Sequence, residues 1–129
     1  MTTRTPDQDA IEACVQKYID GVGQHRTDLI VEAFHPDASM SIHRGPEFAV
    51  VPAPSFIVDF MKTIPPVYET SPDFAGRILS IEQHGPMATV VIAEDKLEGL
   101  NFITYFHVHK VDGNWVITSK STYGEPVQA

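Results

Sequence analysis

The side chains best suited to chemistry lie in one stretch, residues 100–111, which alternates as a β-strand would. Successive side chains of a strand point to opposite faces of the sheet. One face of this stretch therefore carries two imidazoles and a phenol, within the set Ile103, Tyr105, His107 and His109. Histidine titrates near neutral pH and can act as a general acid or base. We expect this face to line a pocket, with His107 as a catalytic residue and Tyr105 and His109 as ligand contacts.

Outside this strand, a tyrosine and another histidine could take part in proton transfer. Tyr18 lies in the middle of the apolar stripe of a predicted helix, so its hydroxyl needs a partner or a cavity. His43 ends a short predicted strand and could supply a base. We expect both to join His107 as catalytic residues, with Tyr18 donating a hydrogen bond to a developing oxyanion.

The last predicted strand, residues 115–123, has two possible registers, because a shift of one residue turns every side chain to the other face. In one register the cavity receives Val116, Thr118, Lys120 and Thr122, and Lys120 brings a positive charge suited to an anionic or carbonyl ligand. In the other register it receives Trp115, Ile117, Ser119, Ser121 and Tyr123, and Lys120 is solvated. We favour the first register, which makes Thr118 and Lys120 ligand contacts. The other ligand contacts expected are Ile42, Phe56 and Phe60, from the short strand and the third helix.

The same strand also carries two possible metal ligands. His107 and His109 put two imidazoles on one strand face, and a third ligand could be His43 or His35. Two-residue spacing alone is a weak indication of a metal site, and no carboxylate is evident nearby. The sequence also contains no glycine-rich phosphate loop, nucleophile elbow or paired carboxylates. We therefore expect neither a metal nor a cofactor.

Length and composition indicate one globular domain, residues 1–129. The formal net charge of −8 disfavours binding to nucleic acid or to an anionic membrane surface, since both require a basic face. No apolar run is long enough to cross a bilayer, and the first residues lack the hydrophobic segment of a signal peptide. The single cysteine, Cys14, suits a reducing compartment, so we expect a cytoplasmic protein.

The pattern of apolar residues predicts an α+β fold. A first helix begins at Thr5 and Pro6 and carries an apolar stripe over residues 11–22. A short second helix follows from Thr27, then a strand over residues 37–43, a proline-marked loop, and a third helix capped by Ser55. The remaining strands are expected at residues 77–83, 87–97, 100–111 and 115–123. Three helices around one short strand, followed by four strands joined by hairpins, predict an antiparallel sheet with helices on one face.

Four features of this layout carry a resemblance to a known group of proteins. They are the helix 11–22 with its tyrosine, the run Phe34-His35-Pro36-Asp37-Ala38 before a short strand, the helix 56–64, and the hairpin 110–115. Together they resemble the NTF2-like superfamily, a cone-shaped α+β fold shared by ketosteroid isomerases, scytalone dehydratases and SnoaL-type polyketide cyclases. Within it, Gly76-Arg77-Ile78, Tyr105-Phe106 and Trp115 with Lys120 are similar to the lumazine-binding, SnoaL-like group.

The resemblance to ketosteroid isomerases extends to single positions. Tyr18 matches the tyrosine of the oxyanion hole, and His107 corresponds to the protonated aspartate of that hole. The position of the catalytic base is Ile42, which cannot take a proton, so the resemblance argues against steroid isomerisation by that mechanism. Scytalone dehydratases resemble this chain in doing acid–base work with histidines and tyrosines.

The resemblance and the candidate residues predict a small-molecule-binding protein. As an enzyme it would be a cofactor-independent lyase, isomerase or cyclase that uses tyrosine and histidine on a carbonyl-bearing, mostly apolar compound. The alternative is a non-catalytic ligand-binding or dimerisation module. The strand face with Phe102, Phe106 and Val108 is too apolar for water, which predicts a homodimer packed through the sheet.

Overall fold

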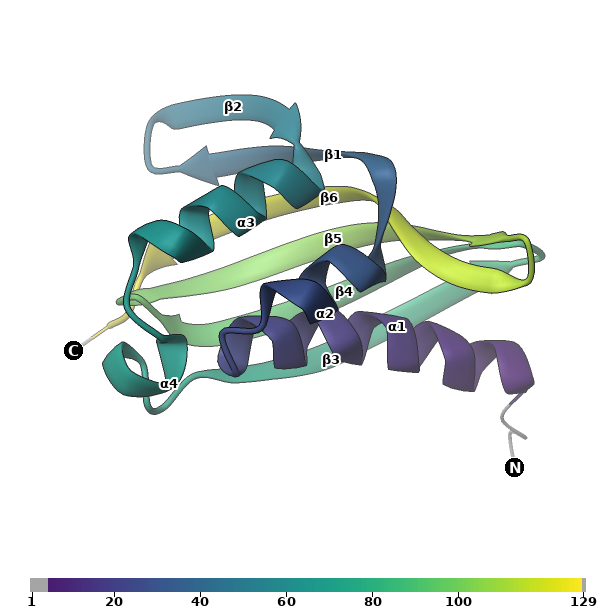
Figure 1. The fold of residues 1–129 in the computed structure, drawn as a ribbon, viewed down its shortest axis with the longest axis horizontal. Coiled ribbons are helices and arrows are strands. Elements are labelled where there is room, and N and C mark those ends of the chain that lie inside the picture. The colour runs from purple at the N-terminus through teal and green to yellow at the C-terminus, as the bar shows by residue number, and fades with distance from the viewer. Residues whose placement is uncertain (1–4, 129) are drawn as a thin grey trace.

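The computed structural model describes residues 5–128 and confirms the expected α+β fold. A six-stranded sheet forms one layer, and helices α1, α2 and α3 pack on one of its faces (Figure 1). In chain order the elements are α1 (Pro6–Gly23), α2 (Thr27–Ala33), β1 (Phe34–Arg44), β2 (Glu47–Pro52), α3 (Ala53–Thr63), α4 (Val67–Thr70), β3 (Ala75–His84), β4 (Met87–Leu97), β5 (Leu100–Val111) and β6 (Asn114–Pro126).

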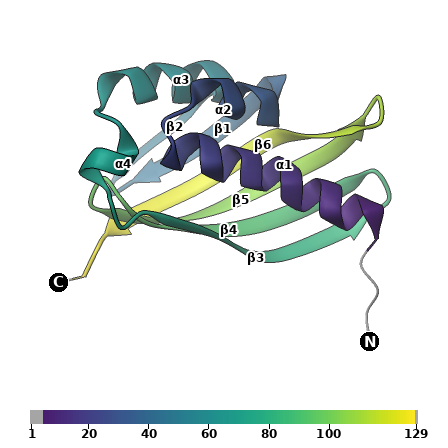
Figure 2. The same cartoon turned by 60° about the horizontal axis from the view of Figure 1, so that its bottom comes forward.

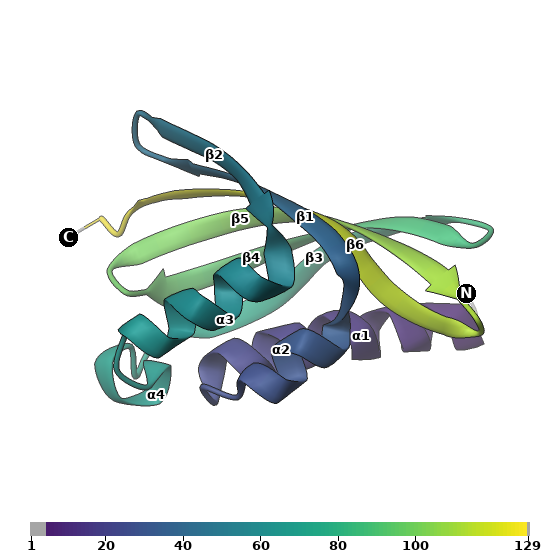
Figure 3. The ribbon, with the colours of Figure 1, turned by 45° about the horizontal axis from the view of Figure 1, so that its top comes forward.

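The strands follow the order β2-β1-β6-β5-β4-β3 across the sheet. Neighbouring strands are antiparallel except for β1 and β6, which run parallel although they lie far apart in the sequence. The sheet curves around the helices, with α1 crossing it toward one end and α3 covering the other end (Figure 2). The hairpin of β1 and β2 extends from one edge of the sheet and leads into α3 (Figure 3).

Helix α1 forms as its sequence predicts. The Thr5 hydroxyl accepts a hydrogen bond from the backbone N–H of Gln8, and the Gln8 side chain accepts one from the Thr5 N–H, at 3.2 Å and 2.9 Å. This capping box satisfies two donors that the helix end would otherwise leave unpaired. The buried face of α1 holds Ile11, Cys14, Val15, Tyr18, Ile19, Gly21 and Val22, so the predicted apolar stripe faces the sheet.

The segment between β1 and α3 differs from its prediction. Residues 47–52, expected as part of a loop marked by Pro46, Pro52 and Pro54, form the edge strand β2. An edge strand is paired on one side only, so a proline at its end removes no ladder hydrogen bond. The N-cap of helix α3 is Pro52, three residues before the expected cap Ser55, and the helix begins at Ala53. The expected polar connector after it contains the short helix α4.

Strand β5 has the predicted bounds, but its two faces are reversed. Phe106 and Val108 are fully buried against the helices, whereas Tyr105 is 56% exposed and His107 is exposed on the opposite face of the sheet. Both faces of this strand contain apolar residues, so alternation alone does not show which one is inward. Burying an imidazole without a partner costs free energy that burying a phenyl ring does not, and the face with the larger apolar side chains is inward.

Strand β6 contains a β-bulge at Thr118. His107 of β5 pairs with Ser119 and the next residue, Val108, pairs with Ile117, which leaves Thr118 as the extra residue. The extra residue changes which side chains face the helices. Trp115 and Ile117 are buried before the bulge, and Lys120 and Thr122 are buried after it. Each of the two predicted registers is therefore correct for one half of the strand.

The core lies between the sheet and α1, α2 and α3, and Phe106 is among its largest fully buried side chains. The Tyr18 ring packs edge-on against Phe34 and Phe106, with centroids 5.7 Å and 5.2 Å away. Among residues 5–128, no helix combines the length and apolarity that a membrane span requires.

Candidate functional site

A cavity of about 280 Å³ lies between α1 and α3 on one side and the inner face of the sheet on the other. Most of its wall is apolar, and the phenylalanines among the lining residues are Phe48, Phe56, Phe60 and Phe102. Its polar members fall into two groups. Glu47 and Glu98 are exposed, while Tyr18, Glu94, Lys120 and Thr122 are buried. The buried group can contact a bound molecule away from water.

Lys120 and Tyr18 form the central contact of the buried group. The Lys120 ammonium donates a hydrogen bond to Tyr18 Oη at 2.6 Å, and Lys120 Nζ lies 4.9 Å from the centre of the Tyr18 ring. Only 7% of Lys120 and 2% of Tyr18 are exposed. A lysine amine is rarely buried without a carboxylate partner, so its pairing here with a neutral phenol is unusual.

Burial shifts the pKa values of both groups toward their neutral forms. Loss of hydration lowers the pKa of Lys120 below its ordinary value, and the attraction of Glu94 opposes this in part. Loss of hydration also raises the pKa of the Tyr18 hydroxyl, with a smaller contribution from the Glu94 charge. The phenol therefore stays protonated and can donate a hydrogen bond at neutral pH.

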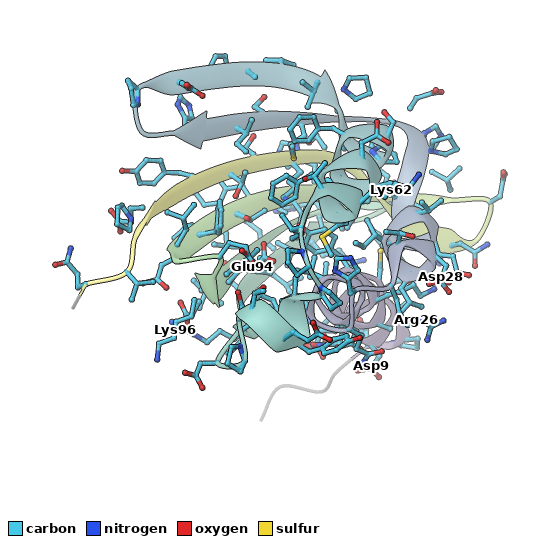
Figure 4. The ribbon with its side chains drawn as sticks, turned by 60° about the vertical axis from the view of Figure 1, so that its left-hand side comes forward. Asp9, Arg26, Asp28, Lys62, Glu94 and Lys96 are labelled. Atoms are coloured by element: carbon cyan, nitrogen blue, oxygen red, sulfur yellow. The ribbon has the colours of Figure 1, made fainter. Side chains whose placement is uncertain are left out.

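Glu94 brings a buried carboxyl group to the same cavity. It is 2% exposed, and its Oε2 atom has no hydrogen-bond partner. Burial raises the pKa of Glu94, and the charge of Lys120 and a hydrogen bond from Thr104 partly oppose the rise. Figure 4 shows Glu94 inside the molecule between the sheet and the helices, whereas Lys96 of the same strand lies at the periphery. An unpaired buried oxygen is costly, so Oε2 is a position where a ligand can supply the missing hydrogen bond.

A pair of threonine hydroxyls completes the polar end of the site. Thr104 and Thr122 face each other on β5 and β6, with their hydroxyl oxygens 2.8 Å apart. Both are buried, and each therefore finds a partner within the sheet. This contact holds the inner face next to Glu94 in one arrangement.

The structure places five of the predicted site residues at the cavity. Tyr18, Ile42, Phe56, Phe60 and Lys120 all line it. Their position is the one that the sequence predicts, and their roles toward a ligand stay predictions.

The other predicted site residues lie outside this cavity. The placement of Tyr105, His107 and His109 is wrong, because their strand face points away from the helices. The two histidines instead line a depression on the outer face of the sheet, next to Glu82 and His84. The position implied by the oxyanion-hole aspartate therefore does not face the cavity in this chain.

The predicted placement of His43 and Thr118 at the cavity is also wrong. His43 is exposed on the β1–β2 hairpin, where its ring lies 4.7 Å from that of Phe48, and it does not line the cavity. Thr118 is the bulged residue of β6, and its hydroxyl donates to the backbone carbonyl of His107 at 3.3 Å. Neither residue can contact a molecule in the cavity directly. Residues 5–128 contain no group of three His, Cys, Asp or Glu side chains arranged to hold a metal ion.

Sequence reasoning missed Glu94. The signal was present, because Ala88, Val90, Ile92 and Glu94 alternate along β4 and are all buried. A carboxylate at the end of such an apolar series lies on the inner face, and a buried carboxylate indicates a functional site.

The curved sheet, its helical cover and the cavity between them define an NTF2-like α+β fold. Solved structures agree with this class. An NTF2-like protein of unknown function from Shewanella baltica OS155 is 24% identical, with a TM-score of 0.86, covering 98% of this chain and 100% of that one. Another from Methylobacillus flagellatus KT is 21% identical, with a TM-score of 0.83 and 96% of each chain covered.

A ketosteroid isomerase-like protein from Erwinia carotovora atroseptica SCRI1043 has the same fold. It is 16% identical, with a TM-score of 0.73, covering 96% of this chain and 100% of that chain. No curated protein matches the sequence significantly. Residues 6–123 match the family described as "Putative lumazine-binding", and the chain belongs to that family.

Proposed function

We propose that the cavity binds a small, mostly apolar molecule with one carbonyl group, whose oxygen faces Lys120 and Tyr18. The observation that carries this proposal is the buried Lys120–Tyr18 pair at 2.6 Å in an otherwise largely apolar cavity. A lysine ammonium has three N–H donors, and the hydrogen bond to Tyr18 occupies one of them. The others can bind an acceptor oxygen. The family description, which names a small molecule, supports ligand binding in general.

The size and charge of the cavity narrow the ligand. A volume of about 280 Å³ lies near the lower end of small-molecule sites and suits a skeleton of about two rings. Glu94 lines the same cavity, and its carboxylate would repel an anionic ligand when it is charged. A neutral ketone or aldehyde therefore suits the site better than a carboxylate.

The reaction class proposed for a SnoaL-like protein of this kind is proton transfer, as in a lyase, isomerase or cyclase. The predicted histidines cannot serve, because His107 and His43 lie outside the cavity. Glu94 takes their place in the scheme, since a carboxyl group with a raised pKa exchanges protons more readily near neutral pH. Tyr18 and Lys120 polarise the carbonyl group. Without turnover, the same contacts make a binding protein.

Three naphthalene probes test the binding proposal. By NMR titration, 2-acetonaphthone is expected to bind about tenfold more tightly than 2-ethylnaphthalene, since one hydrogen bond to a buried donor is worth about 1.4 kcal/mol. The anion 2-naphthoate is expected to bind more weakly than the ketone. Equal affinity of the ketone and the hydrocarbon would contradict the proposal.

A matched pair of variants locates the effect. Lys120→Met keeps a long unbranched side chain but removes the amine, and it is expected to weaken the preference for the ketone, since only the Tyr18 hydroxyl remains as a donor. Lys62→Met changes an exposed lysine in the last turn of α3 (Figure 4) and should leave the preference unchanged.

A second candidate function is dimerisation, which a different surface favours. The residues first expected to form the interface are core residues or line the cavity, since Phe106 and Val108 are fully buried and Phe102 contacts the cavity. The outer face of the sheet nevertheless exposes the apolar side chains of Leu79, Ile103, Tyr105 and Tyr123. Four large side chains exposed on one sheet face support a homodimer packed through that face.

Light scattering after gel filtration tests the dimer. We expect a dimer at micromolar concentration, and we expect Tyr105→Glu to give a monomer. Tyr68→Glu alters an equally exposed tyrosine on α4 and serves as the control. A monomeric parent protein would contradict this function.

We also propose a cytoplasmic location. Its support is Cys14, the chain's one cysteine, which is buried and free.

A further inference from the structure

We propose that Lys120 is a nucleophile that forms an imine with an aldehyde bound in the cavity. This inference rests on the proposed function, because it requires the carbonyl group to lie next to Lys120 and Tyr18. It adds a covalent bond between the Lys120 nitrogen and the carbonyl carbon. The arrangement of three buried groups, Lys120, Tyr18 and Glu94, carries it.

The Lys120 amine is accessible from the cavity. Lys120 is buried from bulk water but lines the cavity, so its amine faces the space that a ligand would fill. Burial in an apolar pocket is the environment in which lysines of enzymes become nucleophilic, because the neutral amine has a free electron pair. The lowered pKa of Lys120 agrees with this environment.

The hydrogen-bond partner of Lys120 is a neutral group. Lys120 bonds to the phenol oxygen of Tyr18 at 2.6 Å, and it forms no direct ion pair among the side chains that the structure describes. A neutral amine keeps two N–H groups, so one of them can still donate to Tyr18 while the electron pair points elsewhere. The phenol therefore orients the amine without requiring that it be charged. A direct carboxylate partner would instead hold the lysine as an ammonium ion.

Imine formation requires an acid, and Glu94 can supply it. Glu94 lines the same cavity, and its Oε2 atom has no hydrogen-bond partner. Its raised pKa keeps a larger share of the carboxyl group protonated near neutral pH than an exposed glutamate would have. Glu94 is therefore placed to exchange protons with a molecule bound to Lys120.

The atoms balance as follows. The Lys120 nitrogen attacks the carbonyl carbon, a C–N bond forms, and a proton moves from nitrogen to oxygen to give a carbinolamine. The Glu94 carboxyl group then protonates the hydroxyl group, which leaves as water while the C–O bond breaks. The resulting iminium ion returns the nitrogen proton to the Glu94 carboxylate. One water is released, and no oxidant or reductant is consumed.

Reductive trapping tests this step. The parent protein is incubated with 2-naphthaldehyde and sodium cyanoborohydride, digested, and analysed by mass spectrometry. We expect the naphthylmethyl adduct on Lys120 to form faster than on Lys62 or Lys96, which are exposed, because the cavity holds the aldehyde next to the Lys120 amine and the lowered pKa of Lys120 leaves more of it as the free amine. Modification at equal rates on all lysines would overturn the inference.

Protection by a ligand gives a test that depends on no variant. Excess 2-ethylnaphthalene, which fills the cavity without reacting, is expected to slow labelling of Lys120 and to leave labelling of Lys62 unchanged. Glu94→Gln keeps the shape of the side chain but cannot donate a proton, and it is expected to slow labelling of Lys120. Undiminished labelling of Lys120 in both experiments would show that the adduct forms without the cavity and would overturn the inference.

The failures of the two proposals can be told apart. If 2-acetonaphthone binds in the cavity and 2-naphthaldehyde never labels Lys120, the imine is refuted and carbonyl binding stands. If the cavity prefers neither the ketone nor the aldehyde over 2-ethylnaphthalene, the proposed function is refuted and the imine with it.

Discussion

The amine of Lys120 lies 2.6 Å from the phenol oxygen of Tyr18, although 102 residues separate them in the chain. Helix α1 supplies the tyrosine and strand β6 supplies the lysine, so the first and last elements of the fold build this contact. The pair is therefore complete only in the folded protein. It can be examined through stability as well as through binding.

Removing the Tyr18 hydroxyl should destabilise the protein. Tyr18→Phe keeps the ring between Phe34 and Phe106 but leaves the buried Lys120 amine without its acceptor. We expect the free energy of unfolding in urea to fall by about 1–3 kcal/mol. Tyr68→Phe changes an exposed tyrosine on α4, outside the proposed dimer face, and should have an effect below about 0.5 kcal/mol. Equal effects of the two substitutions would mean that the buried hydrogen bond contributes nothing.

Lys120 should make stability depend on pH on the alkaline side. Its pKa in the folded protein is lower than the ordinary value of 10.5, so the unfolded chain binds more protons in the interval between the two values. Stability therefore rises as the pH rises through that interval. Lys120→Met should flatten the rise in urea unfolding measured at several pH values. An unchanged slope would mean that the lysine titrates normally.

Glu94 should make the stability of the protein fall with rising pH on the acidic side, which is the opposite of the effect of Lys120. Its pKa in the folded protein is higher than 4.5, so the folded protein binds more protons between 4.5 and the raised value. Stability is therefore greatest below that interval and falls as the pH rises through it. Glu94→Gln should remove this fall. Because Glu47 and Glu98 also face the cavity, Glu98→Gln is the matched control, and an equal effect from it would contradict the assignment to Glu94.

His107→Ala should leave the cavity unaffected. The side chain is exposed on the outer face of the sheet, opposite the helices, so we expect an unfolding free energy within about 0.5 kcal/mol of the parent. The affinity for 2-acetonaphthone should also be unchanged. A large loss of affinity would show that this strand face is reversed in solution.

Cys14 should resist thiol reagents in the folded protein. It is 8% exposed on the inner face of α1, and burial raises the pKa of its thiol to about 11. The reactive thiolate is therefore scarce at pH 8 as well as shielded. Ellman's reagent should give almost no colour with the folded protein and one equivalent in urea. Rapid reaction without denaturant would contradict the packing of α1 against the sheet.

The elements with one strongly apolar face were predictable from the sequence. Helix α1 has a capping signal and an apolar stripe at helical spacing, and both agree with the structure. Strand β5 was predictable as a strand but not in its orientation, since Phe106 and Tyr105 both read as side chains that could be buried. The contact that decides between them, Phe106 against Tyr18 and Phe34, joins three distant parts of the chain.

The candidate site was predictable only in part for the same reason. Tyr18 was predictable because it lies on the apolar stripe of a helix. Lys120 was predictable because it faces the cavity in one of the two possible registers of its strand. Their mutual contact was not, since it depends on the bulge at Thr118, which no local pattern indicates. Glu94 is predictable from the alternation of β4, because it ends a series of inward apolar side chains.

The bulge at Thr118 lets one strand serve two purposes that can vary separately. Before it, Trp115 and Ile117 belong to the packing that holds the domain together, and after it Lys120 and Thr122 belong to the cavity. If the strand kept all its residues but had no bulge, Ser119, Ser121 and Tyr123 would face the helices and the Lys120 amine would reach solvent. Deleting Thr118 would instead leave Lys120 opposite Phe106 and inward. The extra residue thus offsets a change in the alternation of the sequence, so that the packing half and the cavity half of one strand each keep their own pattern of side chains.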